Sequence, residues 1–231
     1  MRQYRGVCLI TGCVRSGTTA MQEWLSQSKE TAVFNESRIS NAACVFLDYV
    51  YNNSALYSNR QHIKELLKTL ICSYVTRVQP IRNKIIVFKE PLPNAYCHFL
   101  IGLNNIFPDL RIIFMVRHPV NVINSMLKRK WGYSLRKCNP SEISPDTAIK
   151  WWKMSAYYYT EYKYKNIYLC KFEDLINNPR NESRKLLQFL GLKGLPAFIP
   201  HATKVLDLDN SITQNILRET RMERKLFGYK Q

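Results

Sequence analysis

The sequence predicts an α/β domain in which a central parallel sheet is flanked by helices. Two patterns predict this fold class: short apolar runs alternate with longer helical patterns, and a glycine-containing loop joins the first run to the first helix. The composition is that of a soluble globular chain, because 46% of the residues are hydrophobic and 22% are charged. The 231 residues contain no repeat and no internal linker, so we expect a single domain over 1–231.

Five short apolar runs have the length and residue types of buried strands. They are Val7–Thr11, Ala32–Phe34, Ile85–Phe88, Arg111–Val116 and Ile167–Lys171. Six longer segments carry helical periodicity. They are Thr18–Gln27, Asn59–Val78, Pro119–Lys130, Asp146–Tyr164, Pro179–Leu190 and Ser211–Leu226. Proline at two helix starts and Gly191 after Leu190 mark three boundaries, and residues 131–145 are expected to form a surface loop.

The charge balance is strongly basic, with 34 Lys and Arg against 17 Asp and Glu and a net charge of +17. The electric field of this positive charge attracts anionic partners but does not identify which one. The seven cysteines are widely spaced and form no metal-like pattern with the four histidines, so reduced thiols in a cytoplasmic protein are expected. No apolar run approaches the roughly 20 residues that span a bilayer, so we expect no membrane anchor.

The loop after the first predicted strand has the features of a phosphate cradle. It runs from Gly12 through Arg15 to Gly17 and leads into a helical pattern. Glycines let the backbone approach a ligand closely, and the amides at a helix N-terminus bind anions. The lysine of a nucleoside-triphosphatase loop is replaced here by Thr18, which argues against transfer of a γ-phosphoryl group.

A second candidate anion site follows the fourth predicted strand. Arg117 stands there, where a nucleotide kinase would carry a magnesium-binding Asp, and Ser125 lies two helical turns further on. Because ligands gather at the carboxyl ends of parallel strands, Arg117 and the glycine loop are expected to face one crevice. Together they suggest two phosphate sites for one nucleotide, used without a metal ion.

These motifs resemble the sulfotransferases that depend on 3′-phosphoadenosine-5′-phosphosulfate (PAPS). The segment Cys13–Thr19 resembles their 5′-phosphosulfate loop, and Arg117–Ser125 resembles their 3′-phosphate site. The likeness continues through Asn105–Asp109, Phe172–Leu175 and Phe189–Gly191 to Leu226–Tyr229 near the end of the chain.

The resemblance implies a P-loop-like α/β fold, PAPS as donor and 3′-phosphoadenosine 5′-phosphate (PAP) as product. Arg15, Ser16, Gly17, Thr18 and Thr19 would hold the 5′ end of the donor. Arg117 and Ser125 would hold its 3′ phosphate.

Two segments depart from the family pattern. Phe172 stands where many cytosolic members carry Tyr, which removes one expected hydroxyl contact to the nucleotide. Residues 201–211 do not clearly match the loop that closes over the donor, and Thr203 and Lys204 are the nearest candidates there.

Sulfuryl transfer needs a base for the acceptor proton and cations for the departing nucleotide. Glu36, just past the second strand, is the candidate base, and Glu90 is its rival. Lys89, after the third strand, and Arg15 are the candidate cations at the transferring group. The residues do not decide between hydroxyl and amine acceptors. A small molecule is expected as the acceptor, with a glycan or a peptide tyrosine as alternatives.

Two other functions remain open at this stage. A P-loop nucleotide kinase would use the glycine loop for ATP, and a polyanion-binding protein would use the basic charge alone. No nucleic-acid motif is recognised and the basic residues are dispersed, so no nucleic-acid partner is expected.

Overall fold

The computed structural model describes residues 4–35, 39–53, 59–91, 99–128, 143–161, 166–199 and 208–230. Five strands form one sheet: β1 (Gly6–Gly12), β2 (Thr31–Asn35), β3 (Ile85–Lys89), β4 (Arg111–Val116) and β5 (Ile167–Lys171). The helices of the first half are α1 (Thr18–Ser26), α2 (Ile39–Asn52), α4 (Arg60–Val78) and α5 (Phe99–Ile106). Those of the second half are α6 (Pro119–Lys128), α7 (Pro145–Glu161), α8 (Phe172–Asn177), α9 (Pro179–Leu190), α10 (Asn210–Glu219) and α11 (Arg221–Leu226).

The strand order is β2-β3-β1-β4-β5, and every neighbouring pair is parallel. Gly12 pairs with Met115, and Asn35 pairs with Lys89. The carboxyl ends of the strands therefore meet at one edge, where an open parallel sheet binds its ligands. The α/β class with a central parallel sheet is confirmed, and each predicted strand lies within a residue of the observed one.

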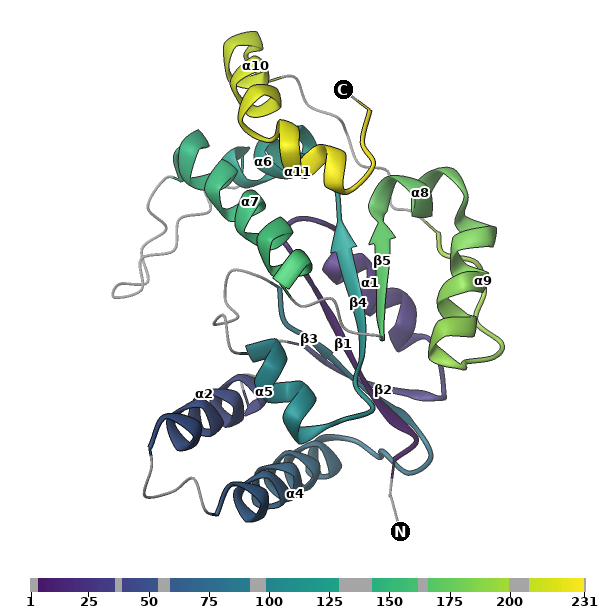
Figure 1. Cartoon of the computed structure of the whole chain (residues 1–231). Coiled ribbons are helices and arrows are strands. Elements are labelled where there is room, and N and C mark those ends of the chain that lie inside the picture. Colours follow the sequence, from purple (N-terminus) through teal and green to yellow (C-terminus); the bar gives the residue numbers. More distant parts are fainter. Residues whose placement is uncertain are drawn as a thin grey trace.

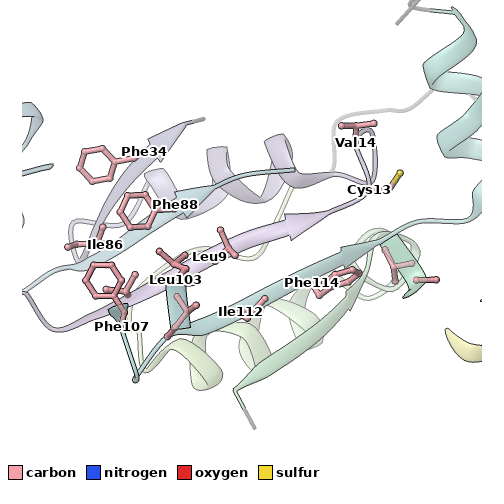
Figure 2. Close-up of a cluster of buried hydrophobic side chains, with 14 of the residues drawn as sticks. Leu9, Cys13, Val14, Phe34, Ile86, Phe88, Leu103, Phe107, Ile112 and Phe114 are labelled. Atoms are coloured by element: carbon pink, nitrogen blue, oxygen red, sulfur yellow. The ribbon is translucent and has the colours of Figure 1, made fainter. Parts of the chain in front are cut away.

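Helices cover both faces of the sheet (Figure 1). One face packs against α2, α4, α5, α6 and α7 through a core that includes Leu9, Phe88 and Phe114. Figure 2 shows part of this core, which reaches Cys13 and Val14 in the loop after β1. The other face packs against α1, α8 and α9 through residues such as Ile10, Met115 and Leu186. The core thus anchors the loop that the sequence marks as a phosphate cradle.

Of the helices in the described residues, three were not predicted, and one predicted helix is two. The α2 helix has apolar residues on both its buried and exposed sides, and α5 contains Gly102 and two asparagines, so neither helix shows a charged outer face. The short α8 follows β5 without a break. The segment predicted as Ser211–Leu226 is interrupted at Thr220, whose buried hydroxyl donates to the Ile216 carbonyl.

Four cysteines with described side chains, Cys8, Cys13, Cys72 and Cys170, are free thiols. Burial raises the pKa of Cys8 to about 12, so that thiol stays protonated at neutral pH. Over the described part of the chain, every helix is too short or too polar to cross a bilayer.

Candidate functional site

The loop between β1 and α1 has a backbone that requires glycine at both ends. Gly12 has a φ of 133°, and a Cβ there would lie 2.1 Å from the Met115 carbonyl oxygen. Gly17 has a φ of 102°, and a Cβ there would lie 2.4 Å from the Phe172 ring. The chain therefore passes against β4 and α8 at distances that no side chain permits.

The α1 helix begins directly after this loop. Its N-cap is Gly17, and no side chain caps the first turn. The amides of the first turn, from Thr18 and Thr19 onward, have no partner within the helix. Thr18 is buried and Thr19 is exposed. This helix end can therefore receive an anion, as the sequence predicts.

Ser16 stabilises the loop through hydrogen bonds to the loop's own backbone. Both its hydroxyl and its amide donate to the Cys13 carbonyl, at 2.6 and 3.1 Å, and its side chain is fully buried. The loop motif predicts that Ser16 contacts the ligand. The structure places its hydroxyl on the protein backbone instead, so a direct contact from Ser16 to a nucleotide stays a prediction.

Arg15 links the two candidate anion sites. Its φ of 69° lies in the left-handed region, which is unusual for a residue with a side chain. From this position its Nε donates to the Ser125 hydroxyl at 3.0 Å, across 110 residues of sequence. The side chains assigned to the 5′ end and to the 3′ phosphate thus meet at one place.

Arg117, directly after β4, is held in place by side chains of two helices, α7 and α8. Its carbonyl accepts a hydrogen bond from the Trp152 indole at 3.0 Å, and the following amide, of His118, donates to Glu173 at 2.8 Å. Its guanidinium lies 4.9 Å from the centre of the Phe172 ring. This packing fixes the direction in which the side chain leaves the strand.

The Arg117 guanidinium is half-buried, yet among the described residues it forms no hydrogen bond or ion pair. Burial lowers the pKa of Arg117, and the nearby Glu173 carboxylate opposes that shift. Arginine still remains protonated at any physiological pH. A half-buried cation that lacks a hydrogen bond or ion pair within the described chain favours an anionic ligand.

Glu173 connects this site to the end of the chain. One carboxylate oxygen accepts from the His118 amide and the other from the Tyr229 hydroxyl, at 2.8 and 2.9 Å. Burial and the Glu173 carboxylate raise the pKa of Tyr229, so its hydroxyl remains a donor. The Tyr229 ring meets the His118 ring edge-on at 5.3 Å. No role was predicted for Glu173 or Tyr229, although both lie in segments that resemble family motifs.

Phe172 packs against residues of both candidate anion sites. Its ring supports the Arg117 guanidinium on one side and closes over Gly17. The sequence suggested only that a nucleotide contact was missing at this position. In the structure this ring joins the two candidate anion sites.

Lys89 lies at the same carboxyl-end edge, at the end of β3. Its side chain is only 5% exposed, and its Nζ donates to the Asn35 side-chain oxygen at 3.1 Å. Glu90 is equally buried, and its backbone extends the pairing of β3 with β1 through Ile10 and Thr11. Glu36, Thr203 and Lys204 lie outside the described residues, as do most of the loops at 131–145 and 201–211.

Comparisons with known proteins indicate a family and a fold for this chain. A family model described as the sulfotransferase family matches residues 8–196. No curated protein sequence matches the chain.

Several solved structures share the fold. The sulfotransferase domain of the olefin synthase from Synechococcus PCC 7002 is 18% identical with a TM-score of 0.63, and the match covers 100% of this chain and 97% of that one. The sulfotransferase domain of the curacin biosynthetic pathway is 17% identical with a TM-score of 0.64, over 99% of both chains. A sulfotransferase from Alicyclobacillus acidocaldarius is 14% identical with a TM-score of 0.57, over 98% of this chain and 97% of that one. These likenesses confirm the P-loop-like α/β fold.

Proposed function

The chain belongs to the sulfotransferase family, and we propose that it transfers a sulfuryl group from PAPS to a hydroxyl or amine acceptor. The observation that carries this proposal is the contact between the two candidate anion sites. Arg15 from the glycine loop reaches Ser125 of the second site. That site also includes the half-buried Arg117, whose guanidinium forms no hydrogen bond or ion pair among the described residues. PAPS carries phosphate groups at both the 5′ and 3′ positions of its ribose, so it needs two neighbouring anion sites.

The residues present fit such a donor. The uncapped N-terminus of α1 and the amides of the loop would hold the 5′ end, with Arg15 adding a guanidinium. Arg117 and Ser125 would hold the 3′ phosphate, which distinguishes PAPS from donors without that group. When bound, the donor supplies the activated sulfuryl group.

The side chains at the strand ends would supply the rest of the chemistry. Glu36 takes the proton from the acceptor as the acceptor attacks sulfur and the bond from sulfur to the phosphate oxygen breaks. Lys89 and Arg15 neutralise the charge that develops on the departing phosphate of PAP. Arg117 stands at the strand end where phosphoryl-transfer enzymes bind magnesium, which supports a mechanism based on side-chain cations.

Calorimetry with PAP and with ATP plus magnesium tests the nature of the donor. We expect PAP to bind and ATP with magnesium to bind far more weakly, because Thr18 replaces the lysine that reaches the β and γ phosphates. Tight binding of ATP alone would favour a nucleotide kinase. Binding of nucleic acid that falls steeply with salt, without binding of PAP, would favour a polyanion-binding protein.

The acceptor is proposed to be a small molecule. Transfer of labelled sulfate from PAPS to pooled acceptors, with the products identified by mass, would name its class. Glycans and tyrosine peptides belong in the pool as the alternatives.

The Gly17→Ala substitution tests the geometry of the phosphate loop. We expect it to weaken PAP binding by about tenfold or more, because alanine is strained at this φ and its Cβ would displace the Phe172 ring. Gly6→Ala is the matched control, since a Cβ at Gly6 meets no atom within 4 Å. Titration calorimetry on the two variants makes the comparison, and equal PAP affinity in both would contradict the assignment of this loop.

A further inference from the structure

Large apolar side chains gather on the solvent side of α2 and α4. Val45, Phe46 and Tyr49 of α2 are 46–56% exposed, and Leu66, Leu70, Tyr74 and Val78 of α4 are 39–58% exposed. We call these seven residues the α2–α4 face. Within the described chain only Tyr157, Ile199, Met222 and Leu226 are large hydrophobic residues with comparable exposure, and they lie on other elements.

The spacing on α4 shows that this exposure is regular. Leu66, Leu70, Tyr74 and Val78 recur every four residues and so form one stripe along the helix. The core uses a separate stripe beside it, made of Leu67, Ile71 and Val75. Apolar residues therefore occupy a wider arc of α4 than burial against the sheet requires.

The α2 helix repeats this arrangement. Ala43, Leu47 and Val50 are buried, while Val45, Phe46 and Tyr49 are exposed. The two helices pack against each other and lie side by side in Figure 1. Single exposed apolar residues are normal, but a group of this size on adjacent helices marks an interaction surface.

The charges of α4 are mainly positive. This helix carries Arg60, Lys64, Lys68 and Arg77 against Glu65 alone. Arg60 and Arg77 are exposed, whereas Lys68 pairs with Glu65 at 3.8 Å. The whole chain carries +17. Exposed aliphatic and aromatic side chains among lysines and arginines match the surface of an anionic bilayer, where apolar groups enter the headgroup region and cations meet lipid phosphates.

We propose that the α2–α4 face docks on the surface of a membrane rich in anionic lipid. This contact is peripheral and leaves the helices folded as they are. The elements at the carboxyl-end edge, including α10 and α11, lie at the other end of the molecule in Figure 1, so docking leaves the candidate donor site accessible. This inference does not depend on which donor or acceptor the protein uses.

Charge disfavours a second copy of the chain as the occupant. A symmetric dimer would bring the same face of each copy together, and so bring one basic α4 near another. Two chains of +17 also repel each other at moderate ionic strength. Docking on an anionic surface avoids this electrostatic repulsion.

Sedimentation with lipid vesicles tests the proposal. We expect binding to vesicles of phosphatidylcholine with phosphatidylserine and little binding to phosphatidylcholine alone. Phe46→Ser combined with Leu70→Ser should weaken binding to the anionic vesicles by about tenfold or more, because two side chains lose their apolar contact with lipid. Both positions are about half exposed, so the fold should persist, which unchanged circular dichroism and thermal midpoint would verify.

The matched control is Ile199→Ser combined with Met222→Ser, which removes two equally apolar and more exposed side chains from other elements. This variant should bind vesicles as the unchanged protein does. Absence of binding by the unchanged protein, or equal loss in both variants, would overturn the proposal. So would light scattering that shows a dimer which only the α2–α4 variant dissociates, because the face would then serve self-association.

Discussion

Replacing Arg117 by alanine should weaken PAP binding by about 3 kcal/mol, roughly 150-fold, while leaving the affinity for adenosine 5′-monophosphate nearly unchanged. The two nucleotides differ in the 3′ phosphate, which is the group assigned to Arg117. A forked guanidinium forms two charge-assisted hydrogen bonds to such a phosphate, and alanine forms none. Titration calorimetry with both nucleotides on both proteins measures the selectivity directly.

Arg111→Ala is the control for this experiment. Arg111 is the first residue of the same strand and donates to the Leu190 carbonyl at the opposite edge of the sheet. Its loss should lower stability without changing the ratio of the two nucleotide affinities. If Arg117→Ala weakened both nucleotides equally, Arg117 would hold the fold or the 5′ end and not the 3′ phosphate.

The second large effect is expected at the proposed base. Glu36→Gln should lower turnover by roughly two orders of magnitude or more, because the glutamine amide cannot accept the proton of the acceptor. PAP affinity should change little, because glutamine has nearly the same size and shape as glutamate. Steady-state kinetics at saturating PAPS, once an acceptor is known, measure this loss.

Glu90→Gln separates the two candidate bases. Lys89 bonds to Asn35, which directly precedes Glu36 in the chain, so Lys89 reaches toward the end of β2. Glu90 is only 5% exposed, and its backbone bonds to two residues of β1, so its carboxylate has little access to an acceptor. Glu90→Gln should therefore retain most of the turnover. The reverse result, an active Glu36→Gln enzyme and an inactive Glu90→Gln enzyme, would transfer the role of base to Glu90.

The strands could be predicted because each carries its own local signal. A buried parallel strand is a short continuous apolar run, and all five runs of this kind are strands. The α2 and α5 helices contain only one charged residue between them, so no charged face marks them as surface helices in the sequence. Both pack against α4 and against each other, and packing of this kind supplies most of a helix's stability.

In the candidate site, too, some residues could be predicted from the sequence and their contacts could not. Arg15 and Arg117 stand out because a cation within a glycine loop or at a strand end has a direct chemical meaning. The contact of Arg15 with Ser125 and the bonds of Glu173 to His118 and Tyr229 join segments far apart in sequence. They follow from the strand order and from the path of the chain after α11, which the sequence pattern does not specify.

A crystal structure of the protein with bound PAP tests the central proposal most directly. We predict the 5′ phosphate on the amides that follow Gly12, up to the first turn of α1, and the 3′ phosphate on Arg117 and Ser125, with Arg15 between them. A nucleotide that leaves either group of residues without a phosphate contact would contradict this account.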